Sequence, residues 1–229
     1  MSGGMIRWVE LDAAWVPGGG SNELRLMQRG AEFSIIAGSI ELMNSRLSGS
    51  EEALAALTCA RLADRPAARV LIGGLGMGFT LRAALARLGP EAVVTVAELV
   101  PAVVAWARGP LAAIHGDSLT DPRVTLFEGD VGELINGAQA RYDAILLDVD
   151  NGPEGLMREA NDDLYDAYGL REAHTALRPG GVLSVWSAAP HAAFTQRLRA
   201  LDFEVEDKRV WANGRGGGGR HVIWLATKG

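Results

Sequence analysis

Apolar residues fall into short runs that alternate with helical patterns between residues 69 and 201. Runs typical of buried strands cover 70–72, 92–97, 123–127, 142–147 and 182–187, and helical patterns follow at 79–88, 100–108, 132–137, 161–177 and 188–201. Two last runs, 203–211 and 221–227, predict a strand pair. This alternation predicts an α/β fold with a doubly wound, mostly parallel seven-stranded sheet and an antiparallel final hairpin.

The first 47 residues follow a different pattern. Four short β-like runs, at 7–11, 24–29, 33–37 and 40–43, are separated mainly by glycine-containing turns. We therefore expect a small antiparallel β-hairpin domain over residues 1–47, followed by a nucleoside-binding catalytic domain over 48–229. A helix over 51–63 begins the second domain, and Ser48 or Ser50 is placed to cap it.

A glycine-rich turn directly follows the strand at 70–72. Gly74, Gly76 and Gly78 recur at spacing two before the helix at 79–88. Glycines allow a ligand to lie against the backbone and allow positive φ, and the free amides of the helix start then face that ligand. We predict that this turn, including Met77, binds a nucleotide or nucleoside, although glycine turns also close ordinary αβ units.

Acidic residues follow the next two strands. Glu98 ends the strand at 92–97, about 20 residues after the glycines, where a carboxylate typically binds a ribose diol. Asp130 begins the helix after the strand at 123–127 and is predicted to contact an adenine edge, with Leu99 and Val131 beside these two acids. A solvated Glu98 and an Asp130 that only caps its helix are the alternatives.

Two further carboxylates follow the strand at 142–147. Asp148 and Asp150 end it, and alternation along an extended segment places both on one side. The crevice beside the carboxyl ends of central strands is where such sheets bind ligands. Paired acids there can position an ammonium or remove its proton, so we predict that Asp148 and Asp150 are catalytic. An Asp/Asn/Gly turn that merely starts a loop is the alternative.

Composition narrows the function classes. The 229 residues carry 22 basic and 28 acidic side chains, a net charge of −6, which argues against a nucleic-acid partner. The single cysteine, Cys59, cannot form an intramolecular disulfide, and no cluster suggests a metal. No run of 18 apolar residues or leader pattern is present, so we expect a cytoplasmic chain without a membrane partner.

Together these motifs resemble the S-adenosylmethionine-dependent methyltransferase fold, which is Rossmann-like. The motifs are the glycine turn at 70–78, Glu98, Gly129-Asp130, the run 142–148 and Leu177-Arg-Pro-Gly-Gly-Val-Leu183. Within that fold the chain is most similar to the spermidine synthase (polyamine aminopropyltransferase) group. The resemblance implies a homodimer that transfers an aminopropyl or related alkyl group from a sulfonium nucleoside to an amine. The co-substrate would be decarboxylated S-adenosylmethionine or S-adenosylmethionine. The resemblance assigns to Asp148 the deprotonation of that amine.

The sequence departs from this group at three places. Met77 replaces the acid of the glycine turn, Asn151 replaces a second acid, and Glu51-Glu-Ala-Leu54 replaces a Tyr-His-Glu pattern. A small-molecule methyltransferase, a non-catalytic binding or dimerisation module and a nicotinamide-dependent oxidoreductase are therefore alternatives. The order of the elements fits the oxidoreductase less well. Trp186 and His191 are further pocket candidates.

Overall fold

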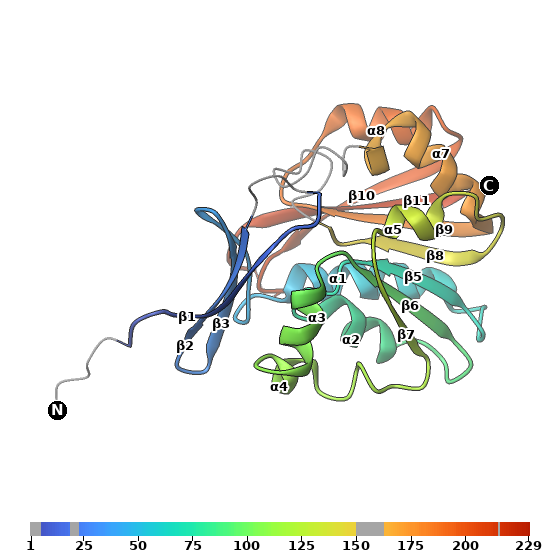
Figure 1. Cartoon of the computed structure of the whole chain (residues 1–229). Coiled ribbons are helices and arrows are strands. Elements are labelled where there is room, and N and C mark those ends of the chain that lie inside the picture. The colour runs from blue at the N-terminus through green and yellow to red at the C-terminus, as the bar shows by residue number, and fades with distance from the viewer. Residues whose placement is uncertain (1–5, 19–22, 150–162, 215) are drawn as a thin grey trace.

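The computed structural model describes residues 6–18, 23–149, 163–214 and 216–229 and contains two sheets (Figure 1). The first is an antiparallel sheet in the order β1-β2-β3-β4. Its strands are β1 (Val9–Trp15), β2 (Glu23–Arg29), β3 (Glu32–Ala37) and β4 (Ile40–Asn44). Four runs with period-two alternation and tight glycine turns thus form the expected hairpins.

The second sheet has seven strands in the order β10-β11-β9-β8-β5-β6-β7. The strands are β5 (Arg69–Gly73), β6 (Val93–Glu98), β7 (Val124–Glu128), β8 (Tyr142–Leu147), β9 (Leu177–Ser187), β10 (Phe203–Trp211) and β11 (Arg220–Lys228). β5 to β9 pair in parallel, and β11 is antiparallel to both β9 and β10. The predicted doubly wound fold with an antiparallel final hairpin is confirmed.

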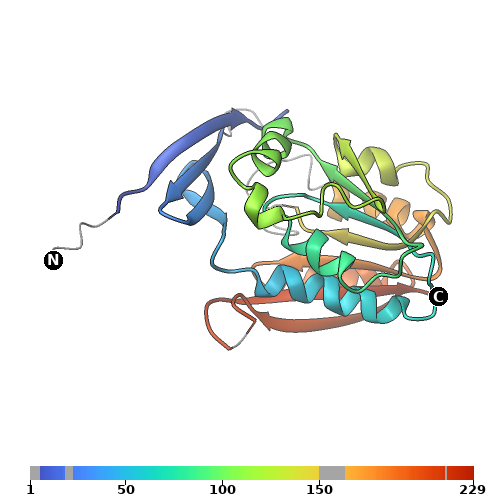
Figure 2. The ribbon, with the colours of Figure 1, turned by 90° about the horizontal axis from the view of Figure 1, so that it is seen from below.

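Helices cover both faces of this sheet (Figures 1 and 2). One face carries α1 (Gly49–Cys59), α2 (Phe79–Leu85), α3 (Pro101–Arg108) and the short α4 (Ala112–His115). The other carries α5 (Val131–Ile135), α7 (Ala167–Ala176) and α8 (Ala192–Arg199). Because each face is covered, β8 is buried along its whole length, as its continuous apolar run predicts.

The N-terminal sheet shares a core with the large sheet. Leu24, Leu26 and Ile35 belong to the same buried cluster as Leu54 of α1 and Val103 of α3. A domain boundary between residues 47 and 48 stays a prediction, because this packing joins the two sheets. In the described part of the chain, no helix is long and apolar enough to cross a membrane.

Two local details differ from the expectations. The side chain of Ser48, the residue before α1, makes no capping bond to the helix backbone, and Ser50 lies buried inside the first turn. β9 begins at Leu177 rather than at 182, and the register against β8 shifts between Tyr142 and Ala144. Gly180, at φ +68°, lies in this irregular stretch.

Candidate active site

The predicted nucleoside residues gather where β5, β6, β7 and β8 end. Gly74 follows β5, Glu98 ends β6, Asp130 follows β7 and Asp148 follows β8. All four line one cavity of about 140 Å³, and so do Gly76, Leu99 and Val131. Parallel strands point their carboxyl ends the same way, which is why segments far apart in the sequence meet here.

The glycine turn needs glycine at this cavity for a steric reason. A Cβ on Gly74, which has φ +91°, would lie 2.3 Å from the main-chain oxygen of Asp148. A Cβ on Gly76, at φ +48°, would lie 2.5 Å from Cε of Met43. The turn therefore presses against both β8 and the N-terminal sheet.

Two residues of the turn that were predicted to contact the ligand, Met77 and Gly78, do not line the cavity. The side chain of Met77 is fully buried in the core and does not line the cavity. Gly78 begins α2 in the left-handed conformation, and a Cβ there would lie 2.4 Å from Nδ1 of His115. Asp150 and Asn151 lie outside the described residues.

Glu98 is held by backbone amides. The N–H of Leu75 donates to its Oε2 and the N–H of Val100 to its Oε1, each at 2.9 Å. Burial raises the pKa of Glu98, and these amide donors oppose that shift. The N–H groups of Gly76 and Leu99 also lower this pKa, so four backbone amides face the carboxylate, and its contact with a ribose stays a prediction.

Asp130 combines both roles considered for it. Its Oδ1 accepts from the N–H of Gly132 at 2.9 Å and so caps α5, while its side chain also lines the cavity. The cap fixes the carboxylate at the rim of the crevice. The two interpretations of this residue are therefore compatible, and its contact with an adenine stays a prediction.

Asp148 lies next to a second carboxyl group. Thr80 Oγ1 of α2 donates to Asp148 Oδ2 at 2.6 Å and lies 3.4 Å from the main-chain oxygen of Glu51 in α1. Burial and the negative charge of Glu51 raise the pKa of Asp148 to about 7, against the hydrogen bond from Thr80. A carboxyl that titrates near neutrality suits a general base.

A second cavity, of about 260 Å³, lies on the Glu51 side. Glu51, Glu41, Trp186 and His221 line it, and Met43 borders both cavities. The Trp186 and His221 rings meet edge to face with centroids 4.7 Å apart. Acidic and aromatic walls are the surroundings that a cation prefers, through ion pairing and interaction with ring faces.

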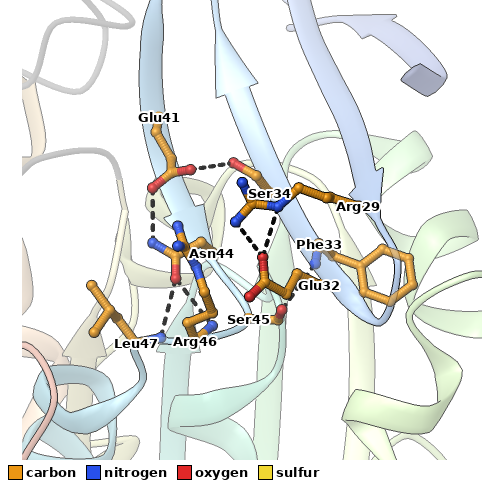
Figure 3. Close-up of polar contacts among 9 residues, drawn as sticks. All are labelled: Arg29, Glu32, Phe33, Ser34, Glu41, Asn44, Ser45, Arg46 and Leu47. Carbon is orange, nitrogen blue, oxygen red and sulfur yellow. Dashed lines mark hydrogen bonds and ion pairs between the residues drawn. The ribbon is translucent and has the colours of Figure 1, made fainter. Parts of the chain in front are cut away.

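Glu41 is fixed by a polar cluster at the end of the N-terminal sheet (Figure 3). Ser34 Oγ donates to Glu41 Oε2 at 2.7 Å, and Asn44 Nδ2 donates to Oε1 at 2.8 Å. Asn44 Oδ1 in turn accepts from the N–H groups of Arg46 and Leu47 at 3.0 and 3.1 Å. The connection from β4 to α1 is thereby fixed against the cavity wall.

The sequence interpretation missed several residues of this wall. Aliphatic side chains of the N-terminal sheet, namely Val16, Leu24, Ile35 and Leu42, close the first cavity. His221 of β11 lines the second cavity, whereas the predicted His191 accepts from the N–H of Phe194 at 2.9 Å and caps α8. Trp186, also predicted, does line the second cavity.

No metal site is evident among the residues that the structure describes, since no three His, Cys, Asp or Glu side chains come together suitably. The chemistry available at this edge of the sheet is that of carboxyl groups, a hydroxyl and an imidazole. Such groups can bind a nucleoside, hold an ammonium and accept its proton.

The sheet order and the crevice define the class I methyltransferase-like fold. Among known families, the "Spermine/spermidine synthase domain" matches residues 51–198 of the chain. The chain belongs to this family, and the predicted resemblance to spermidine synthases is confirmed.

Individual relatives agree with this assignment. The polyamine aminopropyltransferase of Mycobacterium tuberculosis is 33% identical over 135 residues, which are 58% of this chain and 25% of that protein. Putrescine N-methyltransferase 4 of Nicotiana tabacum is 36% identical over 124 residues, which are 52% of this chain and 30% of that protein. The spermidine synthase structure from Thermotoga maritima matches with a TM-score of 0.75 at 17% identity, covering 96% of this chain and 73% of that one.

These matches cover only part of the relatives. The chain spans about a quarter of the length of the M. tuberculosis protein and about a third of the tobacco protein. The match to the T. maritima structure, at 17% identity, concerns the fold.

Proposed function

We propose that this chain transfers an aminopropyl group from decarboxylated S-adenosylmethionine to an amine acceptor. The observation that carries the proposal is the position of Asp148 and Glu51 between two cavities. Asp148 lines the cavity that contains the predicted nucleoside residues, and Glu51 lines the cavity with acidic and aromatic walls. Donor and acceptor would thus approach the carboxyl pair from opposite sides.

The chemistry required is a displacement at a carbon bonded to sulfonium sulfur. The acceptor ammonium loses one proton to Asp148, its nitrogen forms the new N–C bond, and the C–S bond breaks as sulfur keeps the electron pair. The products are a neutral thioether and a secondary ammonium. Because the leaving group is already good, positioning the amine and removing its proton are the main contributions of the protein.

The charges of the first cavity favour the decarboxylated donor. Its lining contains three acidic residues, Glu98, Asp130 and Asp148, and among the described lining residues there is no Lys, Arg or His. A donor that carries a carboxylate would bury it beside these acids without a cationic partner. A donor that carries only positive charges would not.

A methyltransferase that uses intact S-adenosylmethionine is the second candidate. Two observations favour it: the putrescine N-methyltransferase relative at 36% identity, and Met77, which brings no carboxylate from the glycine turn to hold a donor ammonium. A non-catalytic module of the same fold is the third alternative.

Calorimetric titrations with decarboxylated S-adenosylmethionine, the intact form and methylthioadenosine distinguish these candidates. We expect the decarboxylated form to bind more tightly than the intact form. In a separate reaction with a diamine, the acceptor should then gain the mass of one aminopropyl group. Preference for the intact form would assign the chain to the methyltransferases. Absence of binding by all three would overturn both enzymatic proposals.

We also propose a homodimer. Its support is the edge strand β1, where Val9 and Trp15 expose 58% and 62% of their surfaces. Exposed apolar side chains on an unpaired strand edge favour association. Light scattering of the wild type and of a Trp15→Lys variant tests this, since the variant should be monomeric at concentrations where the wild type is dimeric. A monomeric wild type would contradict it.

A further inference from the structure

A hydrogen-bonded chain reaches Glu51 from the C-terminal hairpin. Ser50 Oγ donates to Glu51 Oε2 at 2.6 Å, and His221 Nδ1 lies 2.9 Å from the same Ser50 oxygen. The hydroxyl has a single hydrogen, which the short bond to Glu51 uses. With Glu51 ionised, Ser50 accepts from His221, and Nδ1 of that ring carries the hydrogen.

The backbone holds this chain in place. The N–H of Gly49 donates to the carbonyl of Ala212 at 2.8 Å, which ties the start of α1 to the end of β10. A Cβ on Gly49 would lie 2.0 Å from the nitrogen of Gly214, so the hairpin backbone directly contacts the helix start. The edge-to-face contact with Trp186 fixes the plane of the His221 ring.

We propose that His221 and Ser50 are positioning residues that hold the Glu51 carboxylate toward Asp148, where the two carboxylates together bind the ammonium of the acceptor amine. The proposal rests on the transferase function above. In the reaction, the ammonium gives its proton to Asp148, while the hydroxyl of Ser50 donates to Glu51 and favours its ionised form.

The surrounding charges agree with this division of roles. Burial raises the pKa of Glu51 above its ordinary value although the Ser50 hydrogen bond opposes that shift, and Asp148 faces the charge of Glu51 while it accepts a hydrogen bond from Thr80. Burial lowers the pKa of His221, so its ring is neutral at neutral pH. A neutral imidazole can donate from Nδ1 without adding a positive charge that would compete with the substrate.

The other titratable groups near the pair are also acidic. Glu41 of β4 lines the same cavity, and Glu52 of α1 raises the pKa of Glu51. Among the described residues that line the two cavities there is no Lys or Arg. An ammonium would therefore be the cation that neutralises the pair, which explains why buried carboxyls face one another here.

Nitrogen NMR of the histidine rings in the unliganded protein tests the chain directly. We expect neutral His221 to carry its hydrogen on Nδ1, and Ser50→Ala to shift the resonances of that ring. A wild-type ring that carries the hydrogen on Nε2 would overturn the proposal. This readout needs no turnover, so it separates failure of the proposal from failure of the transferase function.

Kinetics with a diamine then test the role. Glu51→Gln should raise KM for the amine at least tenfold and move the acidic limb of the kcat/KM profile to lower pH, because Asp148 loses its neighbouring charge. His221→Leu and Ser50→Ala should raise KM in the same direction, and His221→Asn, which restores a donor near Nδ1, should recover most of the loss. The proposal would be contradicted if His221→Leu and His221→Asn raised KM equally, or if the kcat/KM profile of Glu51→Gln did not shift to lower pH.

His174→Leu is the matched control. The His174 ring also meets an aromatic ring edge to face, with its centroid 4.8 Å from that of Phe203. His174 lies on α7 and lines neither cavity. We expect this variant to leave KM and the pH profile unchanged. If His221 variants do not fold, Ser50→Ala and Glu51→Gln still decide the outcome.

Discussion

An aspartate lies near each end of strand β8, the buried Asp143 inside it and the half-buried Asp148 just past it, and the two have opposite surroundings. Asp143 receives hydrogen bonds from the Arg65 guanidinium at 2.6 Å, from that of Arg178 at 2.8 Å and from the Arg69 N–H at 2.7 Å. Asp148, past the carboxyl end, faces another carboxyl and receives a side-chain hydrogen bond from Thr80.

The pKa values of these two aspartates follow from their partners. Burial alone would raise the pKa of Asp143, but the N–H of Arg69 and the two guanidinium groups outweigh it and lower the pKa. At Asp148 burial and Glu51 raise the pKa to about 7. We therefore propose that the amino end of this strand serves stability and the carboxyl end serves chemistry.

Replacement of Asp148 by Asn should have the largest effect. We expect kcat to fall by about 10²–10⁴-fold, the range typical of losing a general base, with donor binding retained in calorimetry. The folded pKa is raised, so the wild type loses stability as pH rises from about 4 to about 7, and Asn removes that loss. The variant should therefore be more stable than the wild type at pH 8 in urea unfolding.

Asp143→Asn is the matched control for that change, and its effect should be the reverse. Loss of the charge-assisted bonds should cost roughly 1–3 kcal/mol of unfolding free energy, with kcat of the folded fraction unchanged. The lowered folded pKa means that this stability is present above the ordinary aspartate pKa of 3.8 and is lost as pH falls below it. If Asp143→Asn lowered kcat without lowering stability, the structural role given to the amino end of β8 would be contradicted.

Gly74→Ala tests whether the close approach of β5 and β8 places Asp148. A Cβ there meets the main-chain oxygen of Asp148 at 2.3 Å, and φ is +91°. Gly137→Ala is the control, since its φ is +73° and nothing lies within 4 Å. Both should lose about 1–2 kcal/mol from the left-handed conformation, but only Gly74→Ala should also lose donor affinity in calorimetry. Equal affinities in the two variants would show that the contact is not needed.

Thr80→Val should have the smallest effect. The change keeps the side-chain shape and removes the hydroxyl that donates to Asp148, so the pKa of Asp148 rises further and the acidic limb of the kcat/KM profile moves to higher pH. Thr58→Val is the control, because Thr58 is buried with its Oγ1 bonded to Ser184 and the Leu54 carbonyl. That variant should lose stability without moving the profile. A stationary profile in Thr80→Val would remove Thr80 from the site.

The sequence predicted the strands and the edge of the sheet that forms the crevice. Period and glycine placement are local signals, so the seven strands and the places of Gly74, Glu98, Asp130 and Asp148 after their strands followed from them, whereas the order of the strands in the sheet did not. The same local information did not indicate how the Met77 side chain points, because its direction depends on the core around it.

The residues on the acceptor side could not be predicted in this way. Glu51, Ser50 and His221 come from the start of α1 and from β11, which are about 170 residues apart along the chain. They meet because the hairpin backbone packs on the helix start, and no periodicity encodes that contact. A serine at a helix start resembled a cap, and the structure instead shows it bonded to a neighbouring carboxylate.

Carbon NMR of aspartate carboxyls across pH tests the central claim most directly. With Asp148→Asn and Asp143→Asn used to assign the resonances, we expect Asp148 to titrate near pH 7 and Asp143 to stay ionised below its ordinary range. This result would establish that one strand holds a structural carboxylate at one end and a base at the other. An Asp148 that titrates at or below the same pH as Asp143 would contradict the account.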